Sequence, residues 1–220
     1  MIYVVGGYKG GSGKTTTATN LAVFLLHQKR RILYCDGDVQ GTASLFNEVR
    51  RDFSGQPPLE LVALSGAKLH QQLLPISRDY DDVVVDVGGT DSTSQRAALT
   101  IADTYLTPFP PRAADLWTSQ KVDELIGQAQ EVNPKLRAFS FISRSDTYGL
   151  SGAAGQNAAA YLSNLVHITF LPLVIGNRIV FDRALALGLS VLELTPPDTK
   201  ATFEVNSLFN HLQLLTREKT

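Results

Sequence analysis

Residues 8–16 read Tyr-Lys-Gly-Gly-Ser-Gly-Lys-Thr-Thr and follow the apolar run Ile2-Tyr3-Val4-Val5 after two glycines. A long helical pattern begins immediately after them. A short strand, a glycine-rich turn and a helix in this order are typical of a phosphate-binding loop. The general pattern, G-x-x-x-x-G-K-[ST], would place glycine at Tyr8, so the strict form is missed. The variant K-G-G-x-G-K-[ST] is met in full.

The residue types in this loop suit the binding of a triphosphate. Glycines let the backbone adopt conformations that aim N–H groups at an anion, and the start of a helix adds unpaired N–H groups and the positive end of its dipole. Lys14 can neutralise the β- and γ-phosphates, the Thr15 hydroxyl can ligate Mg2+, and the Thr16 hydroxyl can lie near the α-phosphate. We therefore expect ATP and Mg2+ as ligands. The expected nucleotide-binding residues of the loop are Gly10, Gly11, Ser12, Gly13, Lys14, Thr15 and Thr16.

Lys9, which precedes the glycines, could be an ordinary surface lysine. Its position resembles the deviant Walker A motif of the ParA/MinD family of ATPases. In that family a second lysine reaches the nucleotide of the partner subunit across a sandwich dimer. The resemblance therefore implies a homodimer, with Lys9 and Lys14 among the catalytic residues.

A second motif, Asp36-Gly37-Asp38-Val39-Gln40-Gly41, follows the apolar run 32–35. Two carboxylates at the end of a strand can be simple turn residues. In a phosphate site one can support Mg2+ and the other can orient the attacking water. The sequence resembles the Walker A′ motif, which assigns hydrolysis to Asp38 and support of the metal or the fold to Asp36. Val39 stands where the family usually has proline.

A third motif is the β-branched run Val83-Val84-Val85, which ends in Asp86 and resembles a Walker B strand. A buried parallel strand would deliver the Asp86 carboxylate to the ligand-binding edge of the sheet, where it should reach Mg2+ through a water. By resemblance, the backbone of Gly89 would sense the γ-phosphate.

The later part of the chain extends the resemblance over most of its length. A proline-rich bend at 109–116 resembles the segment that shapes the dimer and partner surface of small partition ATPases, although a rigid loop into a helix at 114–131 explains it equally well. After a strand at 136–143, Arg144 is either an adenine-stacking residue or a surface arginine. The run Gly188-Leu189-Ser190-Val191 matches a late family pattern, and a final helix is expected over 200–215 with Phe203, Leu208, Phe209, Leu212 and Leu215 facing the sheet.

Length and composition limit the possible classes. A chain of 220 residues without an internal linker favours one domain, 1–220. The three motifs, in this order and on these elements, imply an α/β fold: a doubly wound, mostly parallel sheet with helices on both faces. The net charge of −1 gives no global attraction to nucleic acid. The single cysteine, Cys35, is expected to be buried in a strand, which argues against an iron–sulfur reductase. No leader or membrane-spanning run is recognisable, so we expect a cytoplasmic protein.

The resemblance implies an ATPase of the small plasmid-partition (ParF-type) or cargo-positioning (McdA-type) kind. Such an ATPase would bind non-specific DNA in its ATP-bound dimer, be associated with the nucleoid, and be stimulated by a ParB-like or adaptor protein. A MinD-like membrane-associated regulator is the alternative, but the basic tail it needs is poorly developed, so no membrane partner is expected. No substrate residues of a small-molecule ligase or kinase are recognisable. Cations proposed for DNA are Arg178, Arg183, Arg217 and Lys219.

Overall fold

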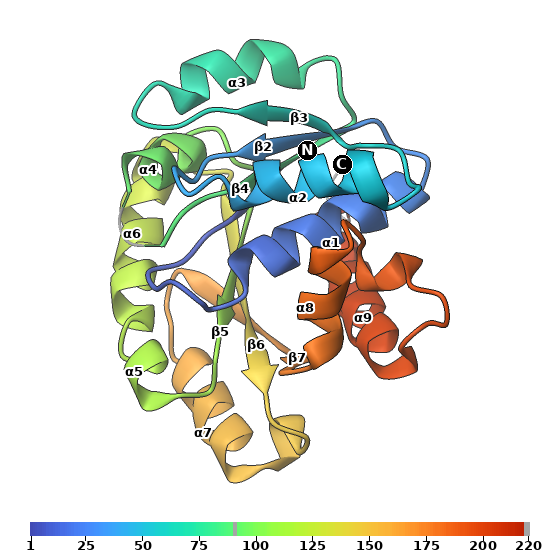
Figure 1. The fold of residues 1–220 in the computed structure, drawn as a ribbon. Helices are drawn as coiled ribbons and strands as arrows, with labels where there is room; N and C mark the ends of the chain where they lie inside the picture. The colour runs from blue at the N-terminus through green and yellow to red at the C-terminus, as the bar shows by residue number, and fades with distance from the viewer. Residues whose placement is uncertain (90–91, 218–220) are drawn as a thin grey trace.

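Within residues 1–89 and 92–217, which the computed structural model describes, seven parallel strands form one sheet (Figure 1). The strands lie in the order β3-β2-β4-β1-β5-β6-β7, and every pair of neighbours is parallel. Their bounds are β1 Ile2–Val5, β2 Ile32–Asp36, β3 Glu60–Ala63, β4 Asp82–Asp86, β5 Thr104–Phe109, β6 Arg137–Ser145 and β7 Ile168–Gly176. The predicted doubly wound α/β fold is confirmed.

Helices cover both faces of this sheet, each over its own apolar core (Figure 1). One face is covered by α1 Lys14–His27, α2 Thr42–Phe53, α8 Ile179–Ala186 and α9 Thr199–Arg217. The other is covered by α3 Leu69–Ser77, α4 Thr93–Leu99, α5 Ala113–Leu116, α6 Ser119–Val132 and α7 Ala153–Leu162. Along β1 successive side chains alternate between the two cores, as the pleat of a strand requires. None of the described helices is long and apolar enough to cross a bilayer.

The single helix predicted over 114–131 is wrong, because the structure divides it into α5 and α6. The break lies at Trp117 and Thr118. The Thr118 hydroxyl donates to the Asp115 carbonyl at 2.6 Å, and the Ser119 hydroxyl donates to the Leu116 carbonyl at 2.7 Å. Hydroxyls that bond back onto nearby carbonyls compete with the regular helical pattern. The consequence is an exposed joint, with Trp117 at 68% exposure.

Strand β6 and the buried face of the last helix differ from the sequence prediction. Strand β6 continues past Ser143, and β7 runs from Ile168 to Gly176, through Pro172. Proline is tolerated there because β7 is an edge strand, with only β6 beside it. In α9 the buried stripe includes Val205, Leu208, Phe209 and Leu212, whereas Phe203 is 72% exposed on the other side of the helix.

Candidate functional site

The carboxyl ends of β1, β2 and β4 meet in register at one edge of the sheet. Val5 pairs with Asp86, and Asp36 also pairs with Asp86. The glycine-rich loop leaves β1 at this level, while the two acidic motifs leave β2 and β4. Three segments far apart in the sequence therefore converge at the place where open α/β sheets bind ligands.

The glycine-rich loop is fixed to the fold by bonds to its backbone. The Ser143 hydroxyl of β6 donates to the Ser12 carbonyl at 2.8 Å, and Gly7 N–H donates to the buried Gln95 side chain of α4 at 3.0 Å. Gly13 forms the N-cap of α1 with φ of 98°, a left-handed conformation that disfavours other residues. The loop is thus shaped before any ligand arrives.

Gly89 packs against this loop more closely than a side chain would allow. A Cβ at Gly89 would lie 2.8 Å from the carbonyl carbon of Lys9 and 2.9 Å from the nitrogen of Gly10. These are backbone atoms of a fixed loop and cannot easily move aside. The backbone of Gly89 is therefore held directly beside the expected phosphate position.

Lys14 is nearly buried beneath the loop. Its Nζ donates to the Lys9 carbonyl at 2.8 Å, so the loop lysine has a backbone partner within the loop itself. Burial lowers the pKa of Lys14, while Asp86 and Asp38 act in the opposite direction. The two carboxylates are thus close enough to Lys14 for their charges to be felt.

Asp86 carries a buried carboxylate without a well-formed hydrogen bond among the described residues. It is 1% exposed, and neither carboxylate oxygen has a hydrogen bond of good geometry within the described part of the chain. Burial raises the pKa of Asp86 to about 7, helped by Asp36 and Asp38 and opposed by the Thr15 hydroxyl and Lys14. A carboxylate of this kind beside a threonine hydroxyl fits the oxygen-donor preference of Mg2+. The observed residues therefore suit the expected metal.

The two carboxylates of the second motif have different surroundings. Asp36 accepts hydrogen bonds from Asp38 N–H at 3.2 Å, Ser44 N–H at 2.8 Å and the Ser44 hydroxyl at 2.6 Å. Asp38 accepts from Gln40 N–H at 3.0 Å, and its carboxyl group lies over Gly88, where a Cβ would come within 3.1 Å. Asp36 is therefore occupied in holding α2, whereas Asp38 is half-buried at the edge of the site.

An open cavity of about 610 Å³ lies over the loop. Its walls include Gly10, Gly11, Gly13, Lys14, Thr15, Thr16, Asp38, Gly89 and Arg144 from the predicted set. Of that set, Lys9, Ser12, Asp36 and Asp86 lie outside the cavity wall. Lys9 lies on the neighbouring surface of the loop, and Ser12 is buried within the loop. Asp36 and Asp86 lie beneath it, at the ends of β2 and β4.

A second, narrower cavity of about 40 Å³ adjoins the first, and Gly13, Thr16, Arg144 and Asp182 line both. Arg144 has φ of 50°, an uncommon backbone conformation that in proteins clusters at functional sites. The narrower cavity also contains Asn177 and Phe181, which the sequence analysis missed. A signal was available for Asn177, which directly follows the carboxyl end of the parallel strand β7, whereas Phe181 lies in the first turn of α8.

Lys9 lies beside α5. Its Nζ lies 4.0 Å from Asp115 Oδ1, and the side chain is 39% exposed. Beside it, Lys121 of α6 lies over the Tyr8 ring at 5.0 Å from the centroid. The proline-rich bend and α6 thus contact the loop directly, on the side away from the larger cavity.

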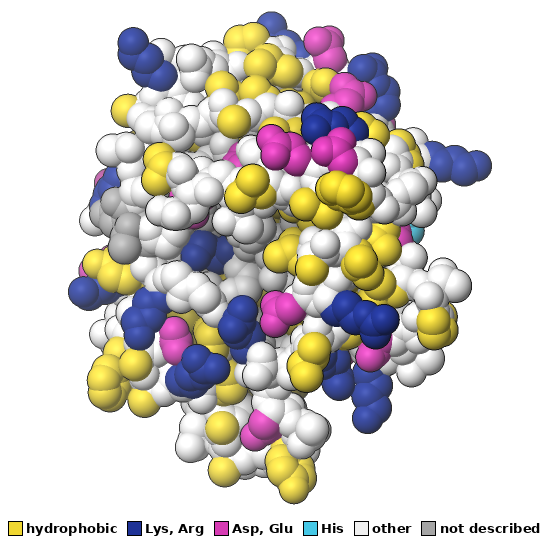
Figure 2. All heavy atoms as spheres, in the orientation of Figure 1, with side chains coloured by type: hydrophobic (Ala, Val, Ile, Leu, Met, Phe, Trp, Pro, Cys, Tyr) yellow, Lys and Arg dark blue, Asp and Glu magenta, His cyan; other side chains and the backbone are white. Residues whose placement is uncertain are grey.

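The cations predicted to contact DNA differ in their exposure and in their contacts with acidic side chains. Arg178 is bound to Glu204 of α9, with Nη2 at 2.5 Å from Oε1. Arg183 is exposed on α8. The side chain of Arg217 and the whole of Lys219 lie outside the described residues. Figure 2 shows Lys and Arg side chains gathered on the lower part of the face seen in Figure 1, with acidic side chains among them.

A family model described as the CobQ/CobB/MinD/ParA nucleotide binding domain matches residues 3–193. The maintenance of carboxysome distribution protein A of Halothiobacillus neapolitanus is 29% identical over 211 residues, or 94% of each chain. Protein ParA of Rhizobium radiobacter is 29% identical over 133 residues, covering 59% of this chain and 58% of that protein.

Solved structures show the same fold. An ATP complex of an alanine variant of Cyanothece McdA has a TM-score of 0.72 at 20% identity, covering 95% of this chain and 96% of that one. The septum site-determining protein MinD of Pyrococcus horikoshii, complexed with Mg-ADP, has a TM-score of 0.71 at 19% identity, covering 100% and 98%. Both are nucleotide-bound members of this architecture.

Proposed function

Because the chain belongs to the CobQ/CobB/MinD/ParA nucleotide-binding family, we propose that it is a positioning or partition ATPase consisting of one ParA-like domain, 1–220. It binds ATP and Mg2+, dimerises around the nucleotides, and binds DNA without sequence preference in that state. The observation that carries the proposal is the buried Asp86 carboxylate, which lies beside Thr15 and Lys14 beneath the glycine-rich loop.

The loop residues have distinct roles in this proposal. Backbone N–H groups of the glycine-rich loop and of the start of α1 bind the phosphates. Lys14 exchanges its bond to the Lys9 carbonyl for the β- and γ-phosphates, and Thr16 lies toward the α-phosphate. The backbone of Gly89 senses the γ-phosphate, because its close approach leaves it beside the loop. Arg144 and the narrower cavity hold the base.

Thr15 and Asp86 would hold the Mg2+ ion, Asp86 through a water, with Asp36 fixing the strand end and α2 nearby. The ion supplies charge neutralisation for the transferring phosphoryl group. Asp38 orients the water that attacks the γ-phosphate. Asp38 suits this role better than Asp36, whose oxygens are taken by protein donors.

Lys9 acts across the dimer in this proposal. It leaves Asp115 and reaches the nucleotide of the partner subunit, so the sandwich forms only when ATP is bound. A ParB-like or adaptor protein then stimulates hydrolysis and resets the cycle. The similarity to a carboxysome distribution protein and to ParA favours a protein assembly or a plasmid as cargo, with the ATPase on the nucleoid.

A direct test is binding of non-specific duplex DNA by the Asp38→Ala variant with ATP, with ADP and without nucleotide, over a salt series. We expect binding only with ATP, and binding that weakens steeply with salt because phosphate contacts release counterions. The matched control is Asp38→Ala combined with Lys14→Ala, which should bind neither ATP nor DNA.

The other results of this test are equally informative. DNA binding that does not depend on nucleotide would contradict the proposed switch. ATP binding without DNA binding would favour the MinD-like regulator, and sedimentation with anionic liposomes would then be the deciding measurement.

A further inference from the structure

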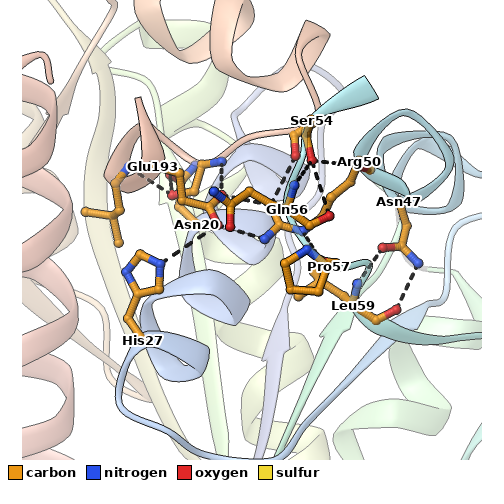
Figure 3. A network of polar contacts seen from close by, with 12 residues as sticks. Asn20, His27, Asn47, Arg50, Ser54, Gln56, Pro57, Leu59 and Glu193 are labelled. Atoms are coloured by element: carbon orange, nitrogen blue, oxygen red, sulfur yellow. Dashed lines mark hydrogen bonds and ion pairs between the residues drawn. The ribbon is translucent and has the colours of Figure 1, made fainter. Parts of the chain in front are cut away.

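A buried polar network joins α1, α2 and the segment between α8 and α9 (Figure 3). At its centre lies the segment 188–193, which contains the Gly188-Leu189-Ser190-Val191 run and the short 3-10 helix η2, Val191–Glu193. Residues 188–193 are not among those that line the two cavities at the site. Their contacts lead instead to the two helices that carry the phosphate loop and the Asp38 loop.

The contact with α1 is made by Asn20, which is 5% exposed. Its Nδ2 donates to the Thr16 carbonyl at 2.7 Å, while its Oδ1 accepts from the Ser190 hydroxyl at 2.7 Å and from Val191 N–H at 3.1 Å. One amide therefore bonds on one side to a residue lining the nucleotide cavity and on the other side to the segment.

The contact with α2 is made by Arg50, whose side chain is completely buried. Its two Nη atoms donate to the Glu193 carboxylate at 2.8 and 2.7 Å, and Nη1 also donates to the Gly188 carbonyl at 3.1 Å. Glu193 in turn accepts from Ser190 N–H at 2.9 Å. Gly188 has φ of 67°, and a Cβ there would lie 2.5 Å from the Arg50 backbone, so the segment lies directly against α2.

Helix α2 is therefore held at both ends. Near its start, Ser44 is bound to Asp36 on β2, and near its end Arg50 is bound to Glu193. The N-cap of α2 is Gly41, whose N–H donates to the Asp38 carbonyl at 3.0 Å. The position of α2 consequently sets the position of the Asp38 loop.

We propose that Asn20 and Arg50 are positioning residues, and that segment 188–193 sets the distance between the phosphate loop and the Asp38 loop. The inference rests on the proposed ATPase function. Burying an arginine–glutamate pair costs desolvation free energy even when the pair is hydrogen-bonded. Apolar residues of similar volume often give the folded protein equal stability. What the polar pair adds is a fixed geometry between α1 and α2, and that geometry places Thr16 and Asp38 around one nucleotide.

The test uses the double variant Arg50→Met with Glu193→Gln, in which glutamine keeps an acceptor for Ser190 N–H and no unpaired charge remains. The matched control is Arg51→Met, the same substitution at the exposed neighbour. Three quantities are measured: the unfolding temperature, the Kd for a fluorescent ATP analogue, and the single-turnover hydrolysis rate. We expect the double variant to fold, to keep its Kd within about threefold, and to hydrolyse at least ~10-fold more slowly, since transition-state positioning is lost while ground-state binding remains. Arg51→Met should match the wild type throughout.

A second measurement does not depend on hydrolysis. Amide hydrogen exchange at Ser190, Val191 and Leu192 should slow when ATP binds to the wild type and to Arg51→Met, because Asn20 transmits the ordering of Thr16. In Asn20→Ala, ATP should leave the exchange rate of these three amides unchanged. This measurement also decides the case if the double variant fails to fold.

The outcomes separate the inference from the proposed function. Wild-type hydrolysis by the double variant, or ATP-dependent protection that persists in Asn20→Ala, would overturn the positioning role. A wild-type chain that binds no ATP would instead overturn the proposed function. A slower rate in Arg51→Met equal to that of the double variant would show a general effect of α2 substitutions and would also overturn the inference.

Discussion

At the scale of single residues, Asp86 shows how a ligand site is built at the expense of stability. The chain places its carboxylate at the buried end of a central strand, beside Asp36, and provides no compensating hydrogen bond of good geometry among the described residues. The folded, ligand-free chain therefore favours the protonated form, with a pKa of about 7. Binding of Mg2+ and nucleotide would offset the free-energy cost of burying the ionised Asp86 carboxylate.

This argument predicts that Asp86→Asn stabilises the ligand-free chain. Between a pH of about 4, where an unfolded aspartate titrates, and a pH of about 7, the folded state holds a proton that the unfolded state releases. The unfolding free energy of the wild type should therefore fall as the pH rises through this window. Above a pH of about 7 the loss should have reached its full size. At pH 8 in EDTA we expect the free energy of unfolding, measured in urea, to be about 1–3 kcal/mol larger for the variant than for the wild type.

The same substitution should remove Mg2+-dependent binding of ATP. The difference in unfolding free energy should shrink toward pH 5, where wild-type Asp86 is mostly protonated. A variant less stable than the wild type at pH 8, or one with an unchanged pH dependence, would show that the Asp86 carboxylate is better solvated than its burial implies.

At the scale of elements, the joint between α5 and α6 is an exposed segment close to the site. It carries Trp117, the sole tryptophan of the chain, at 68% exposure, next to the segment that binds Lys9. Exposed tryptophans beside functional loops are frequent anchors of protein interfaces.

We predict that Trp117 reports the ATP-bound dimer. In the Asp38→Ala background, ATP should shift its fluorescence to shorter wavelength and reduce quenching by acrylamide, because the indole leaves water. ADP should not do so, and adding Lys9→Ala should abolish the response while nucleotide still binds. A response to ATP at protein concentrations where sedimentation finds only monomer would place the change within one chain rather than at an interface.

Helix α9 offers a matched pair of phenylalanines. Phe209 is 1% exposed and packs on Phe24 of α1 with ring centroids 5.4 Å apart, whereas Phe203 is 72% exposed. Phe209→Ala should cost about 3–5 kcal/mol of unfolding free energy because it leaves a cavity. Phe203→Ala should change it by less than about 0.5 kcal/mol. Urea unfolding of the two variants measures both, and similar losses would mean that the outer face of α9 is packed in solution.

Across the whole molecule, the sequence predicted the features that depend on local chemistry. Glycines, a β-branched run and paired aspartates identified the loop and the three strand ends, and they indicated a doubly wound, mostly parallel sheet, whose strand order only the structure gives. Features set by tertiary contacts escaped it. The left-handed backbone of Arg144 depends on neighbours that no spacing reveals. The exposure of Phe203 could have been predicted, because a period of 3.6 residues places it on the face of the helix opposite Leu208 and Leu212.

The charge distribution of the whole molecule leads to a last prediction. With a net charge of −1, attraction to DNA must come from local cations that the dimer presents twice. Arg183 is exposed on α8, next to the nucleotide cavity, whereas Arg178 is already paired with Glu204. Arg183→Ala should therefore reduce the slope of log K against log salt by about 2, one contact for each protomer.

The control for this prediction is Lys135→Ala. Lys135 precedes β6 and so lies at the amino ends of the strands, opposite the nucleotide cavity. It is paired with Asp103 at 3.1 Å, so its removal should leave the salt slope unchanged. Binding is measured by fluorescence anisotropy in the Asp38→Ala background with ATP. Equal slopes for Arg183→Ala and its parent would move the DNA-binding surface away from α8, whereas a reduced slope for Lys135→Ala would indicate contact through the far edge of the sheet.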